Sequence, residues 1–159
     1  MRIILNKNEL ATLWCQINEM CDFCTRIKDK SYNTPFNFKE KYVKYKASYY
    51  WHEKENRLVN DLLGEMGDES LYALVYNHDS FEFNPNEEFL SNKYWYDTER
   101  DVNVYFPSYY PDGDYHFFVS KDFTYGLFGV PFRNEIYAVN NKLITQISKK
   151  TEALGLVLL

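Results

Sequence analysis

The strongest constraint on the fold is a series of short segments, rich in aromatic and β-branched residues, in the second half of the chain. Turn residues such as Gly, Asn, Asp and Pro separate these segments. Strands that follow one another at short intervals pair most readily as antiparallel neighbours. We therefore expect an antiparallel sheet built from residues 71–77, 81–83, 102–106, 115–119, 125–129 and 135–139.

The N-terminal part predicts an amphipathic helix. Asn6 and Glu9 have the spacing of a capping box, so the helix should begin at Lys7. Apolar residues then recur at helical spacing to about Lys28. They are Leu10, Leu13, Trp14, Ile17, Cys21, Cys24 and Ile27.

A second amphipathic helix is expected over residues 53–66, with Gly67 as its stop. Between the two helices, residues 36–51 alternate rings or Val with Lys, as a strand with one solvated face does. A length of 159 residues corresponds to one domain spanning 1–159. Helices first and strands later predict an α+β fold, in which both helices pack on a central, mostly antiparallel sheet.

The connections are harder to assign. Residues 84–101 show no clean period and are expected to form a long loop with at most one helical turn. Pro111-Asp112-Gly113 has the composition of a hairpin corner and should join the strands at 102–106 and 115–119. After the turn at Asn140-Asn141, the stretch KLITQI fits either a strand or a short helix, and the final GLVLL is expected to be a short tail.

Composition indicates a soluble, cytoplasmic protein. Apolar runs all fall short of the ~20 residues of a membrane span, and the N-terminus lacks the apolar core of a signal peptide. The three cysteines, Cys15, Cys21 and Cys24, are an odd number without a spaced framework, so reduced thiols are expected. Cys21 and Cys24 should share one helical face as small buried hydrophobes, although a Cys-His nucleophile pair stays open.

Three motifs together resemble a bacterial domain family. They are LYALVYNHDSFEFNP from Leu71, YPDGDYHFFVSKDFTYGLFGVPF from Tyr110, and IYAVNNKL from Ile136. The chain is similar to a family catalogued as a domain of unknown function, whose members carry a tryptophan-bearing N-terminal helix, a YALDW-like strand and a YPxGDYY-to-FGHPW segment. The chain departs from that pattern at Val75-Tyr76, where Asp-Trp is expected, and around Pro131, where His and Trp are expected. The resemblance implies no activity.

Catalytic and metal-binding patterns are weak. His52, His78 and His116 show no pair at metal-binding spacing, and the loop at Asp112 and Asp114 lacks the further oxygens of a calcium site. The glycines of the stretch GLFG lack the Lys-Ser/Thr of a phosphate loop, which favours close packing or a bulge. We therefore expect no metal, no cofactor and no catalytic residue. The alternative is a small-molecule-binding protein or enzyme with a pocket near His78, Asp114 and His116.

The distribution of charge is the most informative feature. The chain carries a net charge of −5, but residues 79–114 hold nine acidic residues against Lys93 and Arg100, a net charge of −7. Aromatic residues lie between these acids. Rings supply anchors and carboxylates steer basic partners, as in tight protein interfaces. The predicted partner-binding residues are Glu87, Glu88, Tyr94, Trp95, Tyr96, Asp97, Glu99, Asp101, Asp112 and Asp114.

This acidic window disfavours nucleic acid as a ligand, because phosphate binding requires Lys and Arg. It suits a protein that covers a basic enzyme such as a nuclease, and in this character the chain is similar to immunity proteins that neutralise toxins. A non-enzymatic, monomeric or weakly dimeric binder of a basic protein is the expected function. Two alternatives stay open: an oligomerising subunit with its rings at a two-fold interface, and a merely solvated face whose acids are balanced by the chain's own Lys39, Lys41, Lys44 and Lys46.

Overall fold

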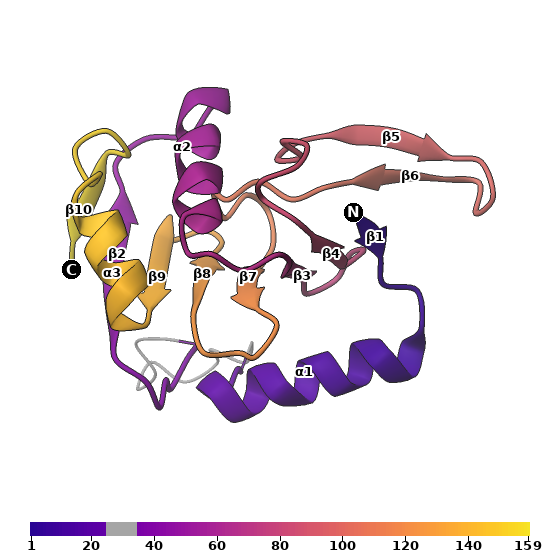
Figure 1. Ribbon diagram of the computed structural model, residues 1–159, viewed down its shortest axis with the longest axis horizontal. Helices are drawn as coiled ribbons and strands as arrows, with labels where there is room; N and C mark the ends of the chain where they lie inside the picture. Colours follow the sequence, from indigo (N-terminus) through magenta and orange to yellow (C-terminus); the bar gives the residue numbers. More distant parts are fainter. Residues whose placement is uncertain (25–34) are drawn as a thin grey trace.

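The computed structural model describes residues 1–24 and 35–159. Within these residues the chain forms one large antiparallel sheet, one separate two-stranded ribbon and three helices (Figure 1). The elements are β1 (Arg2–Ile3), α1 (Lys7–Cys21), β2 (Tyr42–Ala47), α2 (Glu53–Gly64), β3 (Leu71–Val75), β4 (Phe81–Phe83), β5 (Tyr94–Asp97), β6 (Val102–Tyr105), β7 (His116–Ser120), β8 (Gly126–Val130), β9 (Glu135–Val139), α3 (Asn141–Ser148) and β10 (Leu156–Leu158).

The large sheet has the strand order β1-β4-β3-β7-β8-β9-β2-β10, and every neighbouring pair is antiparallel. Helix α1 covers one face, and α2 and α3 cover the other (Figure 1). The α+β class, with helices packed on a mostly antiparallel sheet, is confirmed. Strands β7 and β8 are buried along their whole length because both of their faces are covered.

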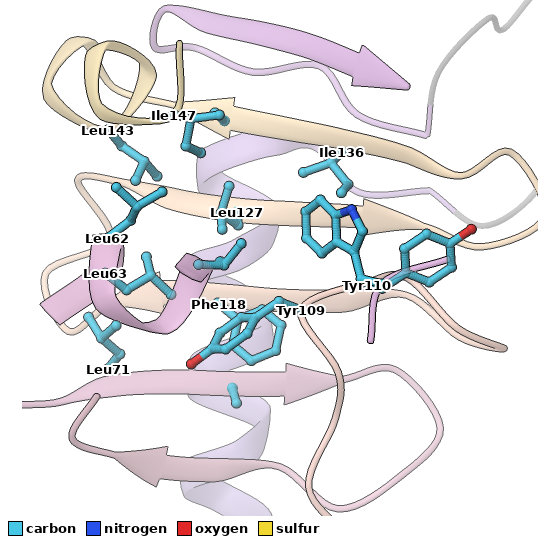
Figure 2. Close-up of a cluster of buried hydrophobic side chains, with 14 of the residues drawn as sticks. Leu62, Leu63, Leu71, Tyr109, Tyr110, Phe118, Leu127, Ile136, Leu143 and Ile147 are labelled. Carbon is cyan, nitrogen blue, oxygen red and sulfur yellow. The ribbon is translucent and has the colours of Figure 1, made fainter. Parts of the chain in front are cut away.

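Alternation along the central strands divides the core into two clusters. Phe118, Leu127 and Ile136 point toward α2 and α3, where leucines and isoleucines of the helices cover them (Figure 2). Their chain neighbours Phe117 and Phe128 point the other way and pack with α1. A period of two in the sequence therefore builds both cores from the same three strands.

Helix α1 begins where the sequence predicts. Asn6 caps it, because its Oδ1 accepts hydrogen bonds from the backbone N–H groups of Asn8 and Glu9 at 2.9 and 3.0 Å. The predicted end at Lys28 is wrong: the helix stops at Cys21, where Asp22 turns into the left-handed region with φ 45°. Cys24 therefore lies outside the helix and shares no helical face with Cys21. The predicted helical positions 25–28 lie outside the described residues.

Helix α2 runs from Glu53 to Gly64, two residues shorter than predicted. Its predicted inner side is correct, since Val59, Leu62 and Leu63 are buried against the sheet and Leu58 is half-buried. The strand predicted over residues 36–51 is shorter, spanning only Tyr42–Ala47.

Two connections differ from the predictions. Residues 84–101 are not a loop throughout, because β5 pairs with β6 as a hairpin, with Tyr94 opposite Tyr105 and Asp97 opposite Val102. The predicted hairpin through Pro111-Asp112-Gly113 is also wrong: β3 and β8 occupy both edges of β7, so β6 cannot pair with it.

Near the C-terminus, KLITQI is a helix and not a strand, because α3 spans Asn141–Ser148. The predicted tail forms β10, which pairs with β2 at one edge of the sheet. The close-packing interpretation of the GLFG glycines is confirmed. A Cβ on Gly129 would lie 2.7 Å from Cβ of Pro111, and one on Gly126 would lie 2.8 Å from the carbonyl oxygen of Phe118.

An ion-pair network connects β1, the edge strand opposite β10, to α1. Arg2 on β1 contacts Glu9 and Glu82, each at 2.6 Å, and Lys121 contacts the second oxygen of Glu82 at 2.5 Å. Hydrogen bonds from Lys121 and then Arg2 lower the pKa of Glu82 to about 2. The charge of Glu82 on β4 thus links β1, through Arg2, to the β7–β8 turn, through Lys121.

We expect Glu82→Gln to lower the free energy of unfolding near neutral pH and to have less effect in acid. The native pKa of Glu82 lies below its ordinary value of 4.5, so its charge stabilises the fold above that value. The contribution is lost as pH falls from about 4.5 toward about 2. Urea unfolding of both proteins at pH 7, 4.5 and 3 measures this difference. Glu19→Gln is the control, an exposed acid of α1 with no ion pair among the described residues; a difference between wild type and the Glu82→Gln variant that stays constant with pH would contradict the expectation.

Candidate functional site

The segment that connects β6 to β7, residues 107–114, crosses the sheet beside α2. We call it the crossing segment. Its first four residues, Pro107, Ser108, Tyr109 and Tyr110, are buried although none belongs to a helix or strand. A buried irregular segment requires hydrogen-bond partners for its backbone, and α2 supplies one of them, to the N–H of Tyr109.

Asn56 of α2 is the centre of this anchorage. Its Oδ1 accepts hydrogen bonds from Ser91 Oγ, Ser108 Oγ and the backbone N–H of Tyr109, at 2.8, 2.9 and 2.9 Å. Its Nδ2 donates to the carbonyl oxygen of His52 at 2.9 Å. The side chain is fully buried, so one amide fixes two distant segments on the helix.

Asn60, one turn further along α2, makes a similar pair of contacts. It accepts a hydrogen bond from the hydroxyl of Tyr109 at 2.8 Å and donates to the carbonyl of Pro85 at 2.8 Å. Sequence analysis missed both asparagines. The available signal is their spacing, because Asn56, Asn60 and Leu63 recur at i, i+4 and i+7 on the inner side of an amphipathic helix.

A cavity of about 280 Å³ lies between the crossing segment, the β3–β4 turn and β6. We call it the hairpin cavity. His78, Asp114 and His116 all line this cavity. These are the residues near which the sequence predicts a pocket as the alternative site. The lining residues are Val75, His78, Asp79, Asn103, Tyr105, Pro107, Asp112, Gly113, Asp114 and His116.

Asp114 and His116 are the buried polar groups of this cavity, with 7% and 3% of their surfaces exposed. Asp114 accepts hydrogen bonds from the backbone N–H groups of Asn77 and Tyr115 at 3.0 and 2.7 Å. The exposed His78 has its Nε2 3.8 Å from Asp114 Oδ2. His116 Nδ1 lies 2.8 Å from the carbonyl oxygen of Ser108. Burial lowers the pKa of His116 although nearby carbonyls and acids oppose this, so the neutral ring predominates at neutral pH.

Asp112 is exposed at the cavity rim and accepts a hydrogen bond from the hydroxyl of Tyr50 at 3.0 Å. Burial and this hydrogen bond raise the pKa of Tyr50 to about 12. Tyr50 was not among the predicted site residues, and its position 62 residues before Asp112 gives no sequence signal.

The β5–β6 hairpin extends away from the large sheet (Figure 1). Tyr94, Tyr96 and Tyr105 are exposed and lie on one side of it, because Tyr94 pairs with Tyr105 and strand residues two apart share a side. We call this the tyrosine face. Trp95, a predicted anchor, points the other way and packs on Phe81 with ring centroids 6.2 Å apart.

The acids of the window divide into two groups. Arg100 contacts both Asp79 and Asp97, at 3.0 and 2.7 Å, and Lys93 contacts Glu88. With Glu82, which contacts Arg2 and Lys121, four window acids have a cationic partner within the described residues. In the described part of the chain, five window acids form no ion pair with Lys or Arg. These are Glu87, Glu99, Asp101, Asp112 and Asp114.

The lysines proposed to balance the window do not do so in the described residues. Lys44 of β2 instead pairs with Glu135 at 3.1 Å. Asp101, at the end of the hairpin turn, accepts a hydrogen bond from the hydroxyl of Tyr96. Four of the five unpaired acids therefore lie at the β5–β6 turn or line the hairpin cavity, whereas Glu87 lies apart, beside Ser70 and Asn84.

The remaining candidates do not form a reactive centre among residues 1–24 and 35–159. His52 is exposed and precedes α2, whose Glu55 carboxylate accepts a hydrogen bond from the His52 backbone N–H at 3.0 Å. Cys21 is buried, and burial raises the pKa of its thiol to about 12, which disfavours a thiolate. No group of three or more His, Cys, Asp or Glu in these residues has metal-binding geometry.

None of the described helices has the length and apolar character required to cross a membrane.

The sequence profile of a family described as protein of unknown function (DUF2716) matches residues 4–144. The chain is also similar to the uncharacterized protein YxiI of Bacillus subtilis (strain 168), with 32% identity over 85 residues. That match covers 54% of this chain and 48% of YxiI, so it spans about half the length of that curated relative. No solved structure matches the chain.

Proposed function

Because the chain belongs to the DUF2716 family of proteins of unknown function, we propose its function from its surface alone: it is a non-enzymatic module that binds a basic protein. The observation that carries this proposal is the projecting hairpin, whose exposed tyrosine face lies beside uncompensated carboxylates. Tyrosines at such a surface supply contact area at low entropic cost, and carboxylates raise the rate of encounter with a positive partner.

The partner class that fits best is a cationic toxin with nuclease-like chemistry, which makes the chain a cytoplasmic immunity protein. An acidic surface can occupy the cleft that such an enzyme uses for phosphates. The tyrosines would then exclude water around the central charge pairs. Asp97 and Glu88 act differently in this scheme from their predicted role, because they hold Arg100 and Lys93 in place.

The test compares capture of partners by a hairpin variant and a matched control. The hairpin variant is Tyr94→Ala with Glu99→Gln and Asp101→Asn. Asn suits position 101, whose φ is 55°. The control is Phe132→Ala with Glu19→Gln and Glu40→Gln, which removes one exposed ring and two exposed acids elsewhere.

A basic protein retained by wild type and control should bind the hairpin variant at least about tenfold more weakly, from one anchor at ~1 kcal/mol and two exposed charges at ~0.5 kcal/mol each. The captured protein, once identified and purified, is titrated at rising salt, and its nuclease activity is measured with and without this chain. Equal affinity for wild type and hairpin variant would remove the hairpin from the interface. Unchanged nuclease activity would remove the toxin assignment.

A small-molecule site is the second candidate, and the hairpin cavity is the specific observation in its favour. It ranks second because about 280 Å³ lies just below the ~300–1,000 Å³ typical of ligand pockets. A thermal-shift screen of small metabolites against wild type and Asp114→Asn tests it. A compound that raises Tm of wild type alone would support this candidate over the protein-binding one.

A further inference from the structure

We propose that the hairpin cavity binds an arginine side chain of the basic partner. This inference rests on the proposed function and names the chemical group that the partner inserts. The cavity borders the tyrosine face directly, because Tyr105 belongs to both and Asn103 lies opposite Tyr96. A protein that covers the tyrosine face therefore has the cavity within reach of its side chains.

The polar groups of the cavity call for a donor. Asp112 and Asp114 present carboxylates, which only accept hydrogen bonds. In the described residues these two carboxylates accept three hydrogen bonds, from Tyr50, Asn77 and Tyr115, which leaves further acceptor positions open. A ligand that carries several N–H groups satisfies these acceptors together.

The charge of the cavity calls for a cation. Asp79 is already bound by Arg100 through both of its oxygens, at 3.0 Å each. Asp112 and Asp114 form no ion pair with Lys or Arg in the described part of the chain, and the exposed His78 is the one ionisable base near Asp114 there. Asp114 is buried and Asp112 is exposed at the cavity rim, so an incoming positive charge is attracted by both acids, and more strongly by the buried one.

The shape of the cavity favours guanidinium over ammonium. Its acceptors come from separate segments, at 103 and 112–114, and a planar fork with five donors reaches separated acceptors better than a compact ammonium does. Tyr105, Pro107 and Val75 add apolar walls, against which the flat face of a guanidinium can stack.

The test uses peptide probes without any captured protein. Wild type is titrated with Gly-Arg-Gly blocked at both ends, and with the same peptide carrying citrulline, a neutral analogue of arginine. The ring signals of His116 and Tyr105 are followed by NMR. We expect saturable shifts with the arginine peptide, and binding at least about tenfold weaker with citrulline, because a hydrogen bond to a charged group contributes ~1.5–3 kcal/mol.

The variant Asp112→Asn should weaken binding of the arginine peptide by about tenfold or more. Asp112 is exposed and its amide can still accept from Tyr50, so Tm should stay close to wild type. Glu152→Gln, an exposed acid outside the cavity, is the matched control and should bind like wild type. Absence of saturable shifts at His116, or equal shifts with citrulline, overturns the inference.

Free arginine separates the two sources of a guanidinium group. It has the same net charge as the blocked peptide, but its charged α-ammonium and α-carboxylate must lose water at the cavity, so it should bind more weakly than the blocked peptide. Tighter binding of free arginine would make the occupant a metabolite and overturn the protein source. Failure of the peptide titration leaves the hairpin capture experiment unaffected, because that experiment alters Tyr94, Glu99 and Asp101 and keeps the cavity residues intact.

Discussion

Replacing Asn56 with alanine is expected to lower the free energy of unfolding by about 3–5 kcal/mol. The change leaves Ser91 Oγ, Ser108 Oγ and the N–H of Tyr109 without their common acceptor. Each of these donors lies in a buried residue, and each unsatisfied donor costs about 1–3 kcal/mol. Urea unfolding at pH 7 measures the difference.

Asn18→Ala is the matched control. Asn18 is an exposed asparagine of α1, so its replacement should change stability by about 0.5 kcal/mol or less. Asn56→Ala should also loosen the crossing segment, which amide hydrogen exchange at Tyr109 and Tyr110 detects. A stability loss below about 1 kcal/mol, with unchanged exchange, would mean that the segment is held by packing alone and not by the asparagine.

Phe117→Ala should have a similar effect, about 3–5 kcal/mol, through loss of packing. Phe117 is fully buried on β7, at the centre of the aromatic cluster that joins α1 to the sheet. Its ring lies 5.5 Å from Trp14, 5.0 Å from Phe23 and 5.3 Å from Phe128, measured between centroids. The cavity left by Phe117→Ala would therefore remove packing contacts between α1 and the sheet.

Phe132→Ala is the control for this change, since Phe132 is 93% exposed and should contribute little. Denaturant unfolding of each variant is followed by Trp fluorescence, which reports the packing around Trp14, and by far-UV circular dichroism, which reports the loss of secondary structure. If Phe117→Ala cost less than about 1.5 kcal/mol, the sheet would have collapsed around the missing ring and the cluster would be less rigid than its contacts indicate.

The elements could largely be predicted because their signals are local. The nearly continuous apolar runs in YHFFV and EIYAV reflect two covered faces of a strand, and the leucine spacing after Glu53 reflects one covered face of a helix. Errors arose where a local signal was weak or shared. YWYD alternates too briefly to announce β5, and Asp22 ends α1 through a left-handed backbone that apolar spacing does not report.

The candidate site was predictable only in part. Residue type alone drew attention to His78, Asp114 and His116, and the fold brings all three to one cavity. Their chemistry depends on contacts between distant segments. Arg2 and Lys121, which lie outside residues 79–114, pair with Glu82 and so reduce the free negative charge that a count over that window suggests.

The sequence by itself determined the fold class, the positions of most helices and strands, and the concentration of acids and rings between residues 79 and 114. Tertiary structure alone decided that β6 pairs with β5 and not β7, and that Asn56 anchors the crossing segment. It also decided which carboxylates are left without a cation. The physical reason is that backbone periodicity acts over a few residues, whereas strand pairing, burial and charge balance depend on groups that meet only when the chain has folded.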